Sequence, residues 1–122
     1  MNQRVILVDT SVWIDHLRRS NNRLVALLNH GEVLCHPFVI GEVACGHLQN
    51  RDEILNLLKA LPEVLIAEHS EVLHFVNMDK LYGRGLGWVD LNLLASASLT
   101  RCSLWTLDKR LQSVAAELKV SV

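Results

Sequence analysis

Residues 5–17 read VILVDTSVWIDHL, and the apolar run at the start of this stretch ends directly at an acidic residue. The run is short and rich in β-branched side chains, which is typical of a strand that is buried on both faces of a sheet. We predict a strand over residues 4–8 and a helix over residues 11–19. Asp9 lies between them, so its carboxylate either caps the helix or does chemical work at the end of a core strand.

The rest of the chain continues this alternation of short apolar runs and helical patterns. Further strands are expected over residues 32–35, 63–67 and 103–107, with a small edge strand starting at Val120. Further helices are expected over residues 22–30, 38–48, 51–60, 70–82, 90–101 and 108–118. The clear strands lack a regular alternation of apolar and polar residues. These features predict an α/β fold around a parallel sheet that is covered on both faces.

The bulk composition limits the possible classes of protein. The chain has 122 residues and 50% of them are apolar, so residues 1–122 are expected to form a single domain with its own core. The net charge is -1. Without an overall basic field, any contact with nucleic acid must depend on a local basic patch.

The cysteines and the longest apolar runs bear on the compartment. Cys35, Cys45 and Cys102 are an odd number without the spacing of a disulfide framework, which favours a reducing compartment. No apolar run approaches the roughly 18 residues that a membrane span requires, and the first one is too short for a signal peptide. We therefore expect a cytoplasmic protein without a membrane partner.

Four acidic residues stand in places that call for an explanation. Asp9 and Asp108 directly follow expected strands, and ligands of open α/β sheets bind beyond the carboxyl ends of the strands. Glu42 and Asp90 belong to helices whose neighbouring residues are almost all apolar. Taken singly, each aspartate is also a good helix cap, and a buried Glu42 is also explained by a buried salt bridge.

As a set, the four carboxylates favour a metal site. Carboxylates that share a pocket repel one another, which raises their pKa values, and a divalent cation cancels that repulsion. Carboxylate oxygens are the ligands that Mg²⁺ or Mn²⁺ prefers. A metal bound in this way lowers the pKa of a water molecule and stabilises charge on a phosphate, which favours hydrolysis of phosphodiester bonds.

Four segments carry a resemblance to a known family over essentially the whole chain. They are VDTSVWID (8–15), IGEVACG (40–46), GWVDLNLLASA (87–97) and LWTLDKRL (104–111). In this order they resemble a PIN-domain ribonuclease, specifically a VapC-type toxin of a type II toxin–antitoxin system. The resemblance implies a three-layer α/β/α sandwich with a central parallel sheet. It also implies catalytic and metal-binding roles for Asp9, Glu42, Asp90 and Asp108, with Ser11 and Thr106 as supporting hydroxyls.

The same resemblance implies an activity and a set of partners. The activity is Mg²⁺- or Mn²⁺-dependent endoribonuclease cleavage of a structured RNA such as tRNA or rRNA. The partners are a second copy of the chain in a homodimer and a cognate VapB-type antitoxin that blocks the site. Operator DNA would be reached only through that antitoxin. The apolar faces of residues 24–28 and 51–61 are expected to serve one of these interfaces.

The last motif departs from the family pattern. The family often has Asp-x-Asp-Phe, whereas this chain has Asp108-Lys109-Arg110-Leu111, so a base replaces an acid and the number of metal ions stays open. The base also offers a contact to an RNA phosphate. Lys109, Arg110 and Arg84 are the expected RNA-binding residues, and the alternative is a solvated basic surface.

Three other functions remain as alternatives. A phospho-receiver signalling module has a similar length and layout, but it needs a pair of acids after its first strand, and here only Asp9 follows that strand. A phosphatase with an Asp-x-Asp motif lacks its second acid for the same reason. A non-catalytic PIN-like domain that binds only RNA or a partner is the other alternative, because of the altered last motif.

Overall fold

The apolar run that ends at Asp9 forms the central strand of a parallel sheet in the computed structural model, which describes residues 5–122. The expected first residue of that strand, residue 4, lies outside the described residues. The strands are β1 (Ile6–Val8), β2 (Val33–Leu34) and β3 (Ser103–Trp105). The helices are α1 (Thr10–Arg19), α2 (Asn22–Asn29), α3 (Pro37–Ala44), α4 (Arg51–Ala60), α5 (His69–Met78), α6 (Trp88–Thr100) and α7 (Lys109–Glu117).

The strands lie in the order β2-β1-β3, and both pairings are parallel. Leu7 at the centre of β1 lies opposite Leu34 on one side and Leu104 on the other. Isolated parallel bridges extend the sheet at both margins, from Cys35 to Glu63 and from Leu104 to Ser121. Because the strands run in one direction, their carboxyl ends meet at a single edge of the sheet.

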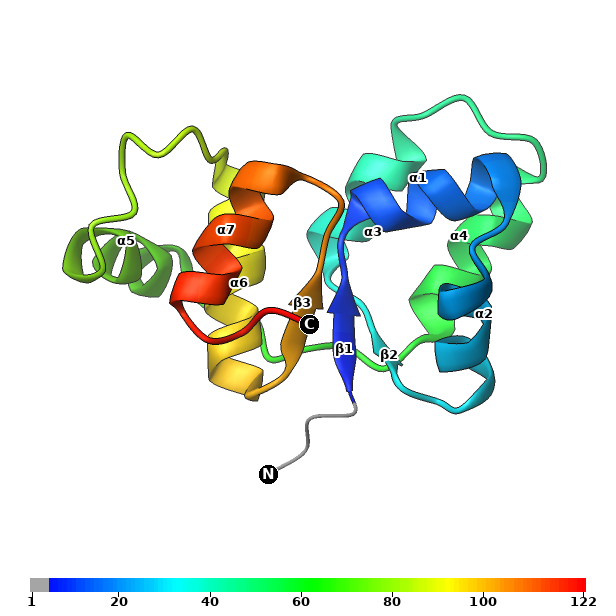
Figure 1. The fold of residues 1–122 in the computed structure, drawn as a ribbon. Coiled ribbons are helices and arrows are strands. Elements are labelled where there is room, and N and C mark those ends of the chain that lie inside the picture. Colours follow the sequence, from blue (N-terminus) through cyan, green and yellow to red (C-terminus); the bar gives the residue numbers. More distant parts are fainter. Residues whose placement is uncertain (1–4) are drawn as a thin grey trace.

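Helices cover both faces of the sheet. In Figure 1, α1 to α4 lie on one side of the sheet and α5 to α7 on the other. The three residues of β1 are buried, as expected for a strand between two helical layers. The predicted three-layer α/β/α sandwich with a central parallel sheet is therefore confirmed.

Helix α6 is the most deeply buried helix of the described chain. Every residue from 91 to 97 is buried, which agrees with the expectation that this segment is too apolar for the surface. The helix begins at Trp88, two residues before the predicted start, and this places Asp90 in its first turn. The carboxylate is therefore at the end of a core helix, near solvent.

The predicted strand over residues 63–67 is wrong. Only Glu63 forms a bridge to the sheet within the described chain. Two residues later, the backbone N–H of Leu65 donates to the side-chain oxygen of Thr100 (3.0 Å) on α6. This tertiary hydrogen bond takes an amide that a strand would have used in its ladder.

Two helices end earlier than predicted. The helix expected over 38–48 ends at Ala44, where the amide of Gly46 closes a tight turn on the Val43 carbonyl (3.1 Å). The helix expected over 70–82 ends at Met78, because Lys80 has a left-handed backbone (φ 53°). The amide of the next residue, Leu81, then donates back to the carbonyl of Val76 (2.9 Å), as in a Schellman ending.

The apolar faces of residues 24–28 and 51–61 pack mainly against the hydrophobic core of the domain. Leu24, Leu55 and Leu58 are buried in the core, and the large exposed apolar residues of these segments are Val25 and Leu57. These faces are therefore less available to a partner than the sequence indicated. Among residues 5–122, no helix has both the length and the apolar character that crossing a membrane requires.

His36 joins β2 to α3 and is 1% exposed. Its Nδ1 accepts a hydrogen bond from the backbone N–H of Phe38 (2.9 Å) and so caps α3, the helix that carries Glu42. Its buried Nε2 has no hydrogen-bond partner among the described residues. Burial lowers the pKa of His36 to about 4, because a charged imidazolium is poorly solvated there.

This histidine predicts an acid-sensitive fold. The unfolded chain binds a proton at His36 near the ordinary pKa of about 6.5, whereas the native chain does so only near pH 4. The free energy of unfolding therefore falls as the pH drops from about 6.5 to 4, with roughly 3 kcal/mol as the upper limit. In urea denaturation across this range, His36→Asn, whose side-chain oxygen replaces Nδ1 as the capping acceptor, is expected to reduce the pH dependence of the free energy of unfolding. The exposed His47→Asn control is expected to retain it, and an unchanged slope in His36→Asn contradicts the prediction.

Candidate active site

Asp9 occupies the N-cap position of α1, but its side chain makes no capping hydrogen bond. Instead, Oδ2 accepts hydrogen bonds from the hydroxyls of Ser11 (2.7 Å) and Thr106 (2.7 Å). The residue is only 6% exposed, and no hydrogen bond within residues 5–122 engages its Oδ1. Capping by the side chain therefore does not explain Asp9.

The two hydroxyls are oriented by backbone amides. The N–H of Leu107 donates to the oxygen of Ser11 (2.9 Å), and the N–H of Asp108 donates to the oxygen of Thr106 (3.0 Å). Each hydroxyl oxygen thus accepts a backbone hydrogen, and its own hydrogen is free to point to Asp9. The structure places both expected supporting hydroxyls in contact with the first acid, and it links the ends of β1 and β3 through them.

The other two aspartates make local helix contacts. Asp108 caps α7, since its Oδ1 accepts from the N–H of Leu111 (3.0 Å). Asp90 accepts from the N–H of Gly87 through Oδ2 (3.0 Å), which ties the first turn of α6 to the preceding loop. Each of these contacts uses one carboxylate oxygen, so the capping explanation is correct for Asp108 without excluding a further role.

Glu42 is exposed, so the expectation of a buried carboxylate is wrong. On α3 the buried side is formed by Val39 and Val43, and Glu42, three residues after Val39, lies at its exposed margin. The apolar composition of the helix concealed this exposure. Its Oε1 accepts a hydrogen bond from the hydroxyl of Thr10 (2.5 Å). No ion pair involves Glu42 within the described residues, so a buried salt bridge does not explain it either.

Thr10 was not identified from the sequence as a site residue. Its hydroxyl, directly after Asp9, is the only hydrogen-bond donor to the carboxylate of Glu42 among the described residues, and it joins α1 to α3. The only available signal was a second hydroxyl residue adjacent to the first acid. Nothing in the sequence indicated that it would reach a helix more than thirty residues away along the chain.

The pKa of Asp90 responds to the other three carboxylates. The pKa of Asp90 is raised first by burial and then by the negative charges of Asp9, Asp108 and Glu42, while its hydrogen bond from Gly87 acts in the opposite direction. All three other acids thus lie within electrostatic reach of Asp90. Each of the four is fixed by hydrogen bonds to one oxygen, and none of the hydrogen bonds in the described chain uses the other oxygen.

The donor chemistry of this cluster fits a hard divalent cation. Four carboxylates supply oxygen ligands of the kind that Mg²⁺ and Mn²⁺ prefer. Within residues 5–122, no three acidic, histidine or cysteine side chains are already arranged around a single point as a metal-binding group.

The three expected RNA-binding residues line one hollow beside Asp108. It has a volume of about 270 Å³ and is bounded by Arg84, Lys109 and Arg110 together with Ser113 and Val114 of α7. Arg110 lies against the loop of residues 83–87, where a Cβ atom at Gly85 would come within 2.8 Å of its Nη1. A residue with a side chain at this position would displace Arg110, and the positive φ of Gly85 (80°) independently favours a glycine there.

Arg84 differs from the other two basic residues because it is already paired. Its guanidinium binds Glu117 through two hydrogen bonds, Nη2 to Oε2 (2.6 Å) and Nη1 to Oε1 (3.2 Å). No ion pair within residues 5–122 engages Lys109 or Arg110. These two residues are therefore better placed than Arg84 to bind an external anion.

The mutual influence of the acids has a direct test in metal-free protein. Removing the negative charge of Asp9 in an Asp9→Asn variant is expected to lower the pKa of Asp90, because one source of repulsion is lost. A carboxyl-detected NMR titration in EDTA measures this pKa. The matched change Asp79→Asn, at the end of α5, is expected to leave it unchanged. An equal pKa in the Asp9→Asn variant and the wild type contradicts the proximity described above.

Comparison with known proteins agrees with the resemblance stated from the sequence. Residues 6–117 match the family model described as PIN domain. The chain is 50% identical over 119 residues to ribonuclease VapC32 of Mycobacterium tuberculosis, from both strain CDC 1551 / Oshkosh and strain ATCC 25618 / H37Rv. The aligned region covers 97% of this chain and 96% of each relative. The chain therefore belongs to the PIN-domain family, with relatives of the VapC type.

Proposed function

We propose that this chain is a metal-dependent endoribonuclease that acts as the toxin of a two-component module. The observation that carries the proposal is the arrangement around Asp9, a buried carboxylate at the sheet edge that two hydroxyls hold by one oxygen. A helix cap needs neither that burial nor those hydroxyls. The similarity to a relative named a ribonuclease supports the choice of RNA as substrate.

The proposed reaction is hydrolysis of a phosphodiester bond in a structured RNA such as tRNA or rRNA. Asp9, Glu42, Asp90 and Asp108 would bind Mg²⁺ or Mn²⁺ through their unengaged oxygens. When bound, such an ion supplies an activated water molecule and stabilises charge on the reacting phosphate. The residues of the chain fix the positions of the ligand oxygens through the hydroxyls of Ser11, Thr106 and Thr10 and through backbone amides.

Basic residues are needed beside this acidic edge, because four carboxylates repel an RNA backbone. We propose that Lys109 and Arg110 contact RNA phosphates from the hollow next to Asp108. Arg84 lines the same hollow. It would bind an RNA phosphate once that phosphate had displaced the carboxylate of Glu117 from its guanidinium. Arg110 occupies a position at which the family often has an acid. The basic side chain removes a negative charge from the site and offers a contact to an RNA phosphate.

The partners in this proposal are those that the family resemblance implies. They are a cognate VapB-type antitoxin, a second copy of the chain in a homodimer, and operator DNA reached only through the antitoxin. A hollow of about 520 Å³ between α5 and α6, which includes Phe75 and the exposed Leu99, offers an apolar surface to a protein partner. A cytoplasmic location is supported by the three free cysteines among the described residues.

The receiver-like and phosphatase alternatives are set aside, because the chain belongs to the PIN-domain family. The competing function is a non-catalytic PIN domain that binds RNA or a partner without cleaving. The two functions differ in a single measurable property, metal-dependent cleavage.

Cleavage of a mixed pool of tRNA and rRNA tests the proposal. Wild-type protein, freed of antitoxin, is expected to give discrete products with Mg²⁺ or Mn²⁺ and none with EDTA. Asp9→Asn is expected to reduce the rate at least about 100-fold, since the amide has the same size but lacks the charge that a metal ligand needs. The control Asp79→Asn is expected to cleave like the wild type.

Two results contradict the proposal. Cleavage by Asp9→Asn at the wild-type rate removes Asp9 from the active site. Retained RNA binding by folded wild-type protein, with no cleavage under any metal, favours the non-catalytic alternative.

A further inference from the structure

A second basic hollow opens at the same edge of the sheet, on the side of α1. It has a volume of about 560 Å³, and Thr10, Ser11 and Leu107 form the end nearest the acids. Its other lining residues are the basic Arg18 and Arg19, the acidic Asp15 and the apolar Ile14. We call it the Arg19 hollow. Since Thr10 binds Glu42 and Ser11 binds Asp9, it is directly continuous with the acidic site.

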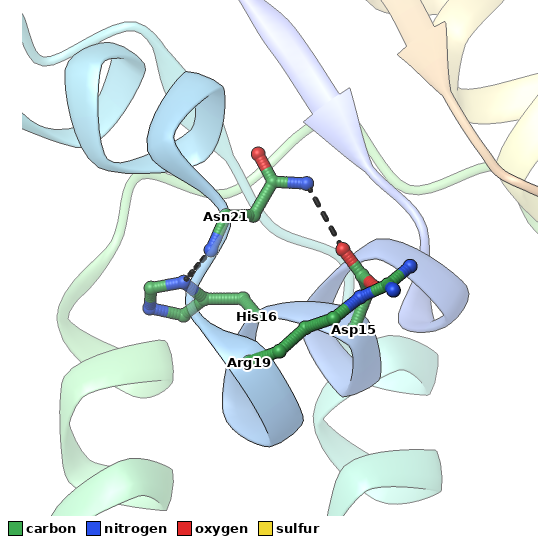
Figure 2. Close-up of polar contacts among 4 residues, drawn as sticks. All are labelled: Asp15, His16, Arg19 and Asn21. Atoms are coloured by element: carbon green, nitrogen blue, oxygen red, sulfur yellow. Dashed lines mark hydrogen bonds and ion pairs between the residues drawn. The ribbon is translucent and has the colours of Figure 1, made fainter.

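Arg19 is oriented by a neighbouring carboxylate. Its Nε donates to Asp15 Oδ1 (2.7 Å), and the side-chain amide of Asn21 donates to Asp15 Oδ2 (3.2 Å), as Figure 2 shows. Both oxygens of Asp15 are therefore occupied. The hydrogen bond from Arg19, followed by the one from Asn21, lowers the pKa of Asp15, so the carboxylate stays ionised.

Asn21 in turn is fixed by the fold. Its backbone N–H donates to Nδ1 of His16 (3.0 Å), and its side-chain oxygen caps α2 by accepting from the N–H of Leu24 (3.0 Å). The support behind Asp15 is thus part of the junction between α1 and α2. A carboxylate on a rigid junction provides a defined position for the guanidinium that it binds.

The guanidinium is available to an external anion. The side chain of Arg19 is 80% exposed, whereas that of Asp15 is 17% exposed. The ion pair engages Nε, and no ion pair within the described residues uses the two terminal nitrogens. An exposed ion pair of this spacing adds little to stability. Its clearer consequence is a guanidinium oriented for bidentate phosphate binding.

The composition of the hollow matches one nucleotide. Its volume lies in the range of small-molecule sites, and it combines cations with apolar surface from Ile14 and the 49% exposed Leu107. Cations bind a phosphate and apolar side chains pack on a base. The other hollow is lined by Lys109 and Arg110, which follow Asp108 in the chain, whereas the Arg19 hollow is lined by Thr10 and Ser11, which follow Asp9. Each hollow therefore adjoins one of the acids.

We propose that the Arg19 hollow binds one nucleotide of a single-stranded RNA segment next to the bond that is cleaved, with Arg19, oriented by Asp15, bound to its phosphate. This inference rests on the proposed ribonuclease function and adds a specificity-determining subsite to it. The subsite requires an unpaired segment in the target, because a base packed on Ile14 and Leu107 must be unstacked from its neighbours.

Binding of a short fluorescein-labelled single-stranded RNA tests the subsite, measured by fluorescence anisotropy. All proteins carry Asp9→Asn, so that cleavage does not interfere. Arg19→Gln is expected to weaken binding about 10-fold and to reduce the salt dependence of log Kd by about 0.7. Arg19→Lys retains the positive charge but lacks the planar guanidinium that can bind a phosphate through two parallel hydrogen bonds. It is expected to give an intermediate loss of RNA affinity. The control Arg101→Gln removes one charge at the opposite edge of the sheet and is expected to bind within about 2-fold of the parent.

The Asp15→Ala variant distinguishes two effects on RNA binding, the orientation of the Arg19 guanidinium and the overall charge of the hollow. The change removes a negative charge, so simple electrostatics predicts tighter RNA binding. Loss of the orienting carboxylate predicts weaker binding, and we expect a loss of several-fold. Thermal denaturation of each variant checks that the fold is retained, and alanine is favourable in a helix.

The outcomes distinguish this inference from the proposed function. Equal binding by Arg19→Gln and Arg101→Gln, or tighter binding by Asp15→Ala, overturns the subsite and leaves the ribonuclease proposal standing. Preference for a duplex of the same sequence also overturns the subsite. Absence of binding to this RNA by the parent protein also overturns the subsite, whereas the cleavage assay decides the ribonuclease proposal separately.

Discussion

The contact on which the site depends is the pair of hydrogen bonds from Ser11 and Thr106 to a single oxygen of Asp9. Burying an ionised carboxylate is costly unless it is hydrogen-bonded. The two hydroxyls meet this requirement for one of the two carboxylate oxygens, Oδ2. The hydroxyls are themselves oriented by the backbone amides that follow β3. The same contact therefore joins the ends of two strands of the sheet and leaves the second carboxylate oxygen without a hydrogen bond among the described residues.

The other acids follow the same principle with different partners. Asp108 and Asp90 accept backbone hydrogen bonds at the beginnings of α7 and α6, and Glu42 accepts the hydroxyl of Thr10. The hydrogen bonds that stabilise the fold also fix the positions of the proposed ligand oxygens. One carboxylate can therefore cap a helix with one oxygen and bind a metal ion with the other. The parallel sheet brings these helix starts together, and the pKa of Asp90 is raised first by burial and then by the negative charges of the other three acids.

The sequence predicted the parts of this arrangement that depend on local pattern. Buried strands that stop at an acid, and a helix too apolar for the surface, required only composition and spacing. The exposure of Glu42 was not predictable, because an eight-residue helix with so few polar residues does not reveal which side faces the core. The loss of the strand at residues 63–67 and the link from Thr10 to Glu42 depend on tertiary hydrogen bonds to distant helices. Such contacts leave no periodic signal.

The central claim is that four carboxylates form one divalent-cation site, and Mn²⁺ binding to metal-free protein tests it most directly. Isothermal titration of the wild type is compared with Asp9→Asn, Glu42→Gln, Asp90→Asn and Asp108→Asn, with Asp79→Asn as the control. The amides retain hydrogen-bonding oxygens, so the helix starts are preserved. The account predicts that each of the four changes weakens Mn²⁺ binding at least about 10-fold and that the control does not. Wild-type affinity in any of the four variants would contradict it.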